Sequence, residues 1–238
     1  MDANDTQPDA RSLPRLGLIG GSIAIVIALA LLPIDGWIAR VMIDVRANVG
    51  GDIKRELETL QQFGAAGSLI IVALIILLQD PGRRARLLDL LAGVVLTALV
   101  VYPMKVLVGR PRPRIELLER DPDLHLVFLT PFRAYDFGPD IGLVHAWELG
   151  ERSAKHLTAM PSAHTAYAVV LGTFLAVLYP RLRPMLIGLV AIVGFARVLF
   201  GAHYPSDVVI AAAIAFAITE RAVSRRLWSG RLGGRPAS

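Results

Sequence analysis

The chain has 238 residues, of which 54% are hydrophobic, and its mean hydropathy of +0.55 excludes an ordinary soluble domain in favour of a single integral membrane domain. The absence of cysteine excludes disulfides, thiolate metal sites and a cysteine nucleophile. The formal net charge of +5 arises from arginines that mostly flank apolar segments, which favours contact with anionic lipid headgroups over nucleic-acid binding.

Six apolar runs predict membrane-spanning helices, because a helix needs about 20 mainly apolar residues to cross a bilayer. The last two runs are short enough to be buried soluble helices, so they span only if their charged ends reach the interface or a polar site. Pro161 predicts that the fourth helix begins inside its run. We therefore expect an all-α fold, a bundle of six transmembrane helices. The runs cover residues 16–34, 63–79, 87–104, 156–180, 184–196 and 208–219.

The first run contains a small-residue pattern at residues 28–30 that resembles a signal-peptidase site. Because the run continues to Pro33, it is long for a signal core, and we expect an uncleaved first span. Residues 1–14 are then a polar N-terminal tail, residues 15–220 the membrane domain, and residues 221–238 a basic C-terminal tail.

An amphipathic segment in two parts is predicted after the first span, over residues 40–62. Ile53, Leu57 and Leu60 share one helix face, and the charges lie elsewhere. We expect this interfacial segment to lie on the bilayer surface.

Basic residues in short loops indicate the cytoplasmic side of the membrane. Arginines follow the second and fourth spans and recur in the C-terminal tail, and with six spans these regions share one side with the N-terminus. We expect a multi-pass protein of the cell membrane with both termini in the cytoplasm. The loop arginines are Arg83, Arg84, Arg86, Arg181 and Arg183.

Three polar clusters interrupt the apolar pattern. Residues 105–113 directly follow the third span, residues 160–165 open the fourth, and Arg197 ends the fifth span just before residues 203–207 open the sixth. The end of an odd span and the start of the next even span face the same side of a membrane. All three clusters should therefore meet on the extracytoplasmic, periplasmic side.

The clusters combine several cations with two histidines, a serine and a carboxylate. Concentrated cations suit a phosphoryl group, whose transfer spreads negative charge over three oxygens, and arginine forks match those oxygens. One neutral imidazole can attack phosphorus while a carboxylate fixes its tautomer, and the second can protonate the leaving oxygen and then activate water. These considerations do not assign the two histidines. The cations are Lys105, Arg110, Arg112, Arg114 and Arg197.

These clusters resemble the motifs of the type 2 phosphatidic acid phosphatase (PAP2) family, which shares its site with vanadium haloperoxidases. The family pattern is Lys-x6-Arg-Pro, then Pro-Ser-Gly-His, then Ser-Arg-x5-His-x3-Asp. The resemblance covers roughly residues 63–220. The matching residues are Lys105 and Arg112-Pro113, then Pro161-Ser162-Ala163-His164, then Ala196-Arg197, His203 and Asp207.

The resemblance implies a role for each matching residue. His203 would be the nucleophile that forms a phosphohistidine, Asp207 would orient it, and His164 would act as acid and then as base. The family needs no metal, and we expect no cofactor. The resemblance further implies that the phosphate is held by Lys105, Arg112, Ser162, the backbone N–H of Ala163, and Arg197.

Two positions depart from the family pattern. Ala163 replaces a glycine whose role is mainly a backbone N–H, and Ala196 replaces a serine hydroxyl. Neither departure removes a proton-transfer group, so they bear on substrate preference and rate rather than on the reaction.

The expected function is an integral membrane phosphatase that hydrolyses a phosphate monoester or diphosphate of a lipid. The alternative enzyme is a lipid phosphotransferase with the same site. The alternative without catalysis is a phosphate-lipid transporter or binding protein. Haloperoxidase activity is not expected, because its members are soluble. Phosphatidate, phosphatidylglycerol phosphate, undecaprenyl diphosphate and a lipid A phosphate are all candidate substrates, and the oligomeric state stays open.

The remaining polar residues near the clusters lie off the motif positions. We expect Arg110 and Arg114 to contact lipid headgroups. The long loop 114–160 carries three further histidines, and we expect it to be solvated. The alternative is that these histidines line a substrate entry together with Trp147, Glu148 and Arg152. The three histidines are His125, His145 and His156.

Overall fold

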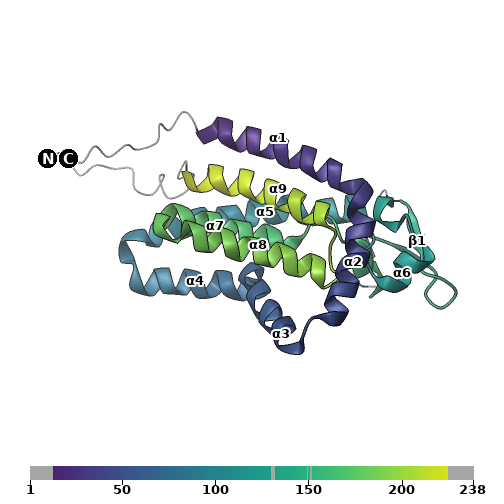
Figure 1. The fold of residues 1–238 in the computed structure, drawn as a ribbon. Helices are drawn as coiled ribbons and strands as arrows, with labels where there is room; N and C mark the ends of the chain where they lie inside the picture. Colours follow the sequence, from purple (N-terminus) through teal and green to yellow (C-terminus); the bar gives the residue numbers. More distant parts are fainter. Residues whose placement is uncertain (1–12, 130–131, 149, 151, 225–238) are drawn as a thin grey trace, which may run out of the picture.

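The computed structural model describes residues 13–129, 132–148, 150 and 152–224, and in its first helix it describes side chains only from residue 20 onward. Six long helices run alongside one another in a bundle (Figure 1). The central helix, α7, packs against α5, α8 and α9, and α9 also packs against α1. The six are α1 (Leu13–Leu31), α4 (Ala66–Gln79), α5 (Leu87–Val108), α7 (Ala163–Leu178), α8 (Arg183–Leu199) and α9 (Pro205–Ser224).

Short elements connect these helices. Residues 40–62 are divided between α2 and α3, in agreement with the predicted two parts, and α2 lies across the end of the bundle (Figure 1). The expected tails fall almost entirely outside the described residues. The connecting helices are α2 (Asp35–Asn48), α3 (Gly51–Leu60) and α6 (Ile115–Arg120), with the 3-10 helices η1 (Leu32–Ile34), η2 (Gln61–Gly64), η3 (Pro81–Arg86), η4 (Leu124–Leu126), η5 (Ser153–Leu157) and η6 (Pro180–Leu182).

The centre of the bundle is closely packed because small residues let its helices approach one another. Phe174 and Val170 of α7 are fully buried in one apolar cluster with Ala211 and Ala215 of α9. A side chain at Gly194 of α8 would bring its Cβ within 2.8 Å of Val208 Cγ1 on α9. This packing fixes the ends of α7, α8 and α9 relative to one another.

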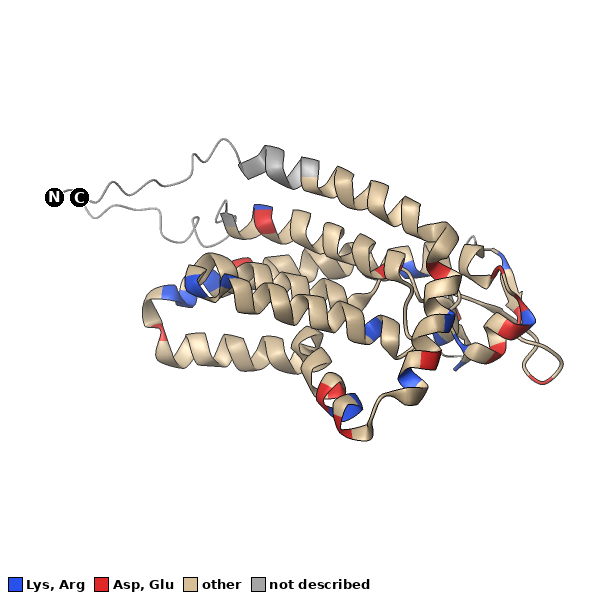
Figure 2. Cartoon of the chain, viewed as in Figure 1, with Lys and Arg blue, Asp and Glu red and all other residues tan. Residues whose placement is uncertain are grey.

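The outer faces of the bundle are apolar and exposed, as expected of a membrane protein. On α4, for example, Ile71, Ile75 and Leu78 have 59%, 54% and 67% of their surface exposed. Figure 2 shows that charged residues gather at the two ends of the bundle and are sparse along the helices between them. Such a charge-free band is the surface that hydrocarbon would contact.

The number of spans is not confirmed as six. Among the described residues, three helical segments are long and apolar enough to cross a membrane: Gly20–Asn48, Pro81–Val108 and Pro180–Leu199. A fourth is reached if Gly51–Gly64 and Ala66–Gln79, which are bent by 61°, form one span. The apolar helix α7 has only 16 residues, and α9 carries Asp207, Glu220 and Arg221. Because of its length, α7 does not count among these segments, and α9 does not because of its charged residues.

The all-α expectation holds except for a small sheet in the long loop. Strands β1 (Ala134–Asp136) and β2 (Leu143–His145) pair antiparallel, with Tyr135 opposite Val144. Val144 is buried in a small apolar cluster that also holds Leu129 and Leu157. The loop is therefore folded onto the end of the bundle where the three polar clusters lie.

Candidate active site

The first polar cluster follows the end of α5. Lys105 lies in the last turn of that helix, which ends at Gly109 in the left-handed conformation (φ +56°). The chain then runs extended beside residues 156–159: the N–H of Arg112 donates to the carbonyl of His156 (2.7 Å), and the N–H of Ala159 donates to the carbonyl of Arg110 (2.9 Å). Lys105 Nζ donates to the carbonyl of Thr158 at 2.7 Å. These bonds hold the first cluster against the segment that leads into the second.

The second cluster opens α7. Ser162 is fully buried, its N–H donates to the carbonyl of Asp207 (3.2 Å), and its Oγ accepts from Thr165 Oγ1 (3.0 Å). Ser162 makes no side-chain cap to the helix. The first N–H groups of a helix have no intrahelical acceptor, so the start of α7 at Ala163 offers donors and a positive dipole end to an anion.

His164 lies in the first turn of α7, beside the three cations. Its imidazole interacts electrostatically with Arg197, Arg112 and Lys105. The backbone of η2 comes very close to it, since a Cβ at Gly64 would lie only 2.1 Å from the carbonyl oxygen of His164. Glycine is thus required at residue 64 for the chain before α4 to pass the start of α7.

His203 lies in the turn between α8 and α9 and is only 2% exposed. Its Nδ1 is 2.6 Å from the carbonyl oxygen of Ala159 and 3.8 Å from Asp207 Oδ2. Because a carbonyl only accepts, Nδ1 carries the proton, and the lone pair of the neutral ring is on Nε2. Burial, reinforced by the nearby charge of Lys105, lowers the pKa of His203 to about 3, although Asp207 acts in the opposite direction. The ring is therefore neutral near pH 7.

Two half-buried arginines complete the cluster. Arg197 donates to Gln61 Oε1 (2.9 Å), and Arg112 reaches Thr158 Oγ1 at 3.5 Å. The Nε atoms of Arg112 and Arg197 are buried and have no acceptor among the described residues. Burial, with a smaller contribution from the charge of Arg114, lowers the pKa of Arg112. Buried donors of this kind suit an anionic ligand, because an unpaired buried polar group is unfavourable.

The structure thus brings together the three clusters that the sequence predicted to meet. Bonds join the first cluster to the segment before the second, the second cluster to the third, and the third back to Ala159. All eight predicted site residues lie at this end of the bundle. They are Lys105, Arg112, Ser162, Ala163, His164, Arg197, His203 and Asp207.

The prediction that Arg110 contacts lipid headgroups is wrong. Arg110 is fully buried and forms ion pairs with Asp35 (2.8 Å) and Asp207 (2.6 Å). Arg114, by contrast, is exposed. A guanidinium beside hydrocarbon needs a carboxylate partner, and Asp35 at the end of the first apolar run was the sequence signal for one. Sequence reasoning also missed Gln61, for which the pattern held no signal.

The expectation of a solvated loop is wrong for part of residues 114–160. His125 is 8% exposed, and its carbonyl accepts from Arg110 Nε (3.0 Å). His156 is half-buried, and burial together with Arg114 lowers its pKa. His145 pairs instead with Glu148 (2.8 Å). In the described part of the chain, no group of three or more His, Asp or Glu side chains could hold a metal ion.

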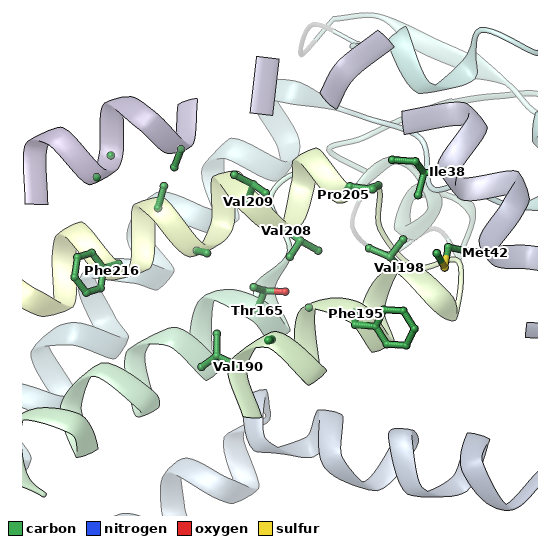
Figure 3. A pocket seen from close by; sticks show the side chains of 17 residues that line it. Ile38, Met42, Thr165, Val190, Phe195, Val198, Pro205, Val208, Val209 and Phe216 are labelled. Atoms are coloured by element: carbon green, nitrogen blue, oxygen red, sulfur yellow. The ribbon is translucent and has the colours of Figure 1, made fainter. Parts of the chain in front are cut away.

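An apolar groove of about 560 Å³ lies beside the site, between α1, α2, α7, α8 and α9 (Figure 3). Phe195, Val208 and Phe216 line it, and Thr165 supplies a hydroxyl. That hydroxyl donates to Ser162. Thr165 therefore links the lining of the groove to Ser162 of the second polar cluster.

Two solved structures share this architecture. The crystal structure of Aquifex aeolicus LpxE superposes with a TM-score of 0.53 at 15% identity, covering 77% of this chain and 93% of that one. The first transmembrane PAP2-type phosphatidylglycerolphosphate phosphatase from Bacillus subtilis gives 0.52 at 18% identity, covering 93% and 97%. At identities this low, the superpositions establish a shared fold and nothing more. A search of curated protein sequences found no match.

The three clusters also lie within a region recognised by a sequence family. The model of the PAP2 superfamily matches residues 86–229, which is more than half of the chain. The match confirms the resemblance inferred from the motifs, although it begins after residue 63. This chain is a membrane protein of the PAP2 superfamily.

Proposed function

We propose that this protein is a lipid phosphatase that hydrolyses a phosphate monoester or diphosphate through a phosphohistidine. The observation that carries the proposal is the buried imidazole of His203, whose Nδ1 is held by Ala159 and whose neutral Nε2 is left for attack. Neutral imidazole is the form that attacks phosphorus. A protein that only binds phosphate has no need of it.

In the first step His203 Nε2 attacks phosphorus, and the bond from phosphorus to the lipid oxygen breaks. The developing imidazolium is stabilised by Asp207, and His164 gives its proton to the leaving oxygen. The nearby Lys105, Arg112 and Arg197 support this assignment, because they can bind the three phosphoryl oxygens. A bound phosphate would also favour the protonated form of His164, since an opposite charge stabilises a cation.

In the second step His164 accepts a proton from water, and the water oxygen attacks phosphorus. The bond between phosphorus and His203 Nε2 breaks, which returns the neutral ring and releases inorganic phosphate. Ser162 and the N–H of Ala163 hold the phosphoryl oxygens in both steps. The first N–H groups of α7 support this role, because they have no intrahelical acceptor and Ser162 does not cap them.

A lipid substrate is supported by the position of the site at the end of an apolar bundle, next to the groove of Figure 3. Hydrocarbon in that groove would contact an apolar lining while the headgroup reaches Ser162. The protein would act on a phosphorylated lipid within the bilayer.

We further propose that α1, α4, α5, α7, α8 and α9 each cross the membrane, with both termini in the cytoplasm. The turn η3, with three arginines, and the turn η6, with one, lie at the end of the bundle opposite the polar clusters (Figure 2). Their position supports this orientation. The site then faces the periplasm.

The test is phosphate release by the purified protein in detergent, with EDTA present, from phosphatidate, phosphatidylglycerol phosphate, undecaprenyl diphosphate and a lipid A phosphate. Wild type should release phosphate from at least one lipid, and His203→Ala should abolish it. With a phosphorus-labelled lipid, His164→Ala should slow hydrolysis of the label held on His203. Turnover only when a second alcohol is added would indicate a phosphotransferase, and folded protein that binds but never releases phosphate would indicate a binder.

A further inference from the structure

Behind His203 lies a network of four side chains that are each 0% exposed: Arg110, Asp35, Ser206 and Asp207. Arg110 donates from Nη1 to Asp207 Oδ1 (2.6 Å) and from Nη2 to Asp35 Oδ2 (2.8 Å). Ser206 joins the two halves, because its Oγ accepts from Arg110 (2.7 Å) and donates to Asp35. The N–H of Ser206 also donates to Asp35 Oδ1 at 3.1 Å.

The charges of this network do not cancel. It holds one guanidinium and two carboxylates, and buried charges are tolerated only when they are paired and hydrogen-bonded. Arg110 contacts both carboxylates, and its guanidinium lies 4.2 Å from the ring centre of Tyr204. Burial would lower the pKa of Arg110, but Asp207 and Asp35 outweigh it and raise that pKa. Arg110 is thus a permanent cation shared between two carboxyl groups.

This sharing acts on the carboxylate that faces the proposed nucleophile. Asp207 Oδ1 is held by Arg110, while Oδ2 accepts from the N–H of Tyr204 (2.8 Å) and lies 3.8 Å from His203 Nδ1. The carboxylate is thereby held from both sides with one oxygen toward the imidazole. A guanidinium paired with Asp207 alone would offset more of the charge that His203 experiences.

We propose that Arg110 and Asp35 are positioning residues for Asp207. Arg110 fixes the orientation of the Asp207 carboxylate, and Asp35 draws part of the guanidinium charge away, so that Asp207 keeps the negative charge needed by the imidazolium of His203. The proposal rests on the phosphohistidine chemistry proposed above. Asp35 precedes the residues matched by the family model, 86–229, so the N-terminal segment completes the site.

The sharpest variant is Asp35→Asn, which removes the charge and keeps nearly the same shape. We expect kcat to fall roughly 10- to 100-fold, the range for outer groups that orient reacting side chains at metal sites, with KM changed by less than about twofold. The matched control is Asp89→Asn. Asp89 is equally buried and lies 3.4 Å from Arg86 near the opposite end of the bundle, so this variant should lose stability but keep kcat.

A second pair of variants separates positioning from simple loss of charge. Arg110→Lys keeps the cation but has no fork to bridge two carboxylates, so kcat should fall while the protein still folds. Adding Asp35→Asn to Arg110→Lys should then cause little further loss, because the two residues act as one unit. Unchanged kcat and pH profile in a folded Asp35→Asn protein, or full additivity of the two losses, would overturn the proposal.

The ring nitrogens of His203 provide a readout that needs no turnover. The chain has five histidines, so nitrogen NMR of labelled protein can be assigned with His203→Gln. Asp35→Asn should shift the His203 nitrogens, whereas Asp89→Asn should not. If the wild type releases no phosphate but Asp35→Asn shifts the nitrogen resonances of His203, the proposed function fails and the positioning role stands. If Asp35→Asn leaves the nitrogen resonances of His203 unchanged, the positioning role fails whatever the phosphatase activity.

Discussion

His203 Nδ1 lies 2.6 Å from the carbonyl oxygen of Ala159, which is closer than its 3.8 Å separation from Asp207 Oδ2. The nearest partner of the ring is therefore a neutral backbone group. This arrangement fixes the tautomer without drawing the proton toward a carboxylate. Asp207 then acts on the ring mainly through its charge.

The first prediction concerns the charge of His203. Its pKa of about 3 in the folded protein lies below the roughly 6.5 of an unfolded histidine. As pH falls from about 6.5 toward 3, the unfolded chain binds a proton that the folded ring does not, so this histidine makes the protein less stable over that window. Thermal unfolding in detergent at pH 7.5, 6, 5 and 4 should show the loss. His203→Gln should lose less stability over the same range, and equal losses in the two proteins would contradict the assignment.

The second prediction concerns Gly64. A Cβ there would meet the backbone oxygen of His164 at 2.1 Å, and a backbone atom has little freedom to move. Gly64→Ala should lower the free energy of unfolding by about 1–3 kcal/mol, the range for overpacked sites, and reduce phosphate release. Gly67→Ala is the control, because a Cβ at Gly67 meets nothing within 4 Å. Similar melting temperatures for the two variants would refute the close approach.

The third prediction concerns Gln61, whose Oε1 accepts from Arg197 at 2.9 Å. Gln61→Ala removes the bond that orients the guanidinium of Arg197, and a hydrogen bond to a charged group contributes about 1.5–3 kcal/mol. We therefore expect competitive inhibition by inorganic phosphate to become about tenfold weaker. Its neighbour Gln62 is exposed, and its Nε2 donates to the carbonyl of Glu58. Gln62→Ala should leave inhibition unchanged, and the idea is refuted if both variants respond alike.

The fourth prediction concerns Thr165, which donates to Ser162 Oγ at 3.0 Å. Thr165→Val keeps the shape but removes the donor, so the Ser162 hydroxyl can rotate. We expect stability to fall by about 1 kcal/mol and kcat/KM to fall several-fold. Thr173→Val on the same helix is the control and should keep kcat/KM. A larger loss for Thr173→Val would show that the effect belongs to α7 as a whole.

Much of this molecule followed from local patterns. The apolar runs located the long helices, because each run has the length and composition that a helix beside hydrocarbon requires. The three motifs placed His164, His203 and Asp207 at one end of the bundle, since successive spans reverse direction. The predicted number of six spans is not confirmed, because α7 is short and α9 carries charged residues.

Pairings between distant residues had no local signal. Arg110 was expected at the lipid surface, yet it is buried between Asp35 and Asp207, which are 75 and 97 residues away in the chain. The sequence could not identify the carbonyl of Ala159 as the partner of His203, because every residue has a backbone carbonyl.

Residue identity and spacing thus determined the helical class, the membrane setting and the chemical groups of the site, because these depend on hydropathy and on fixed motif spacings. The tertiary structure decided which of those groups are buried, which carbonyl holds the imidazole, and how one guanidinium is divided between two carboxylates. Such choices depend on which surfaces pack together, and packing is a property of the folded chain.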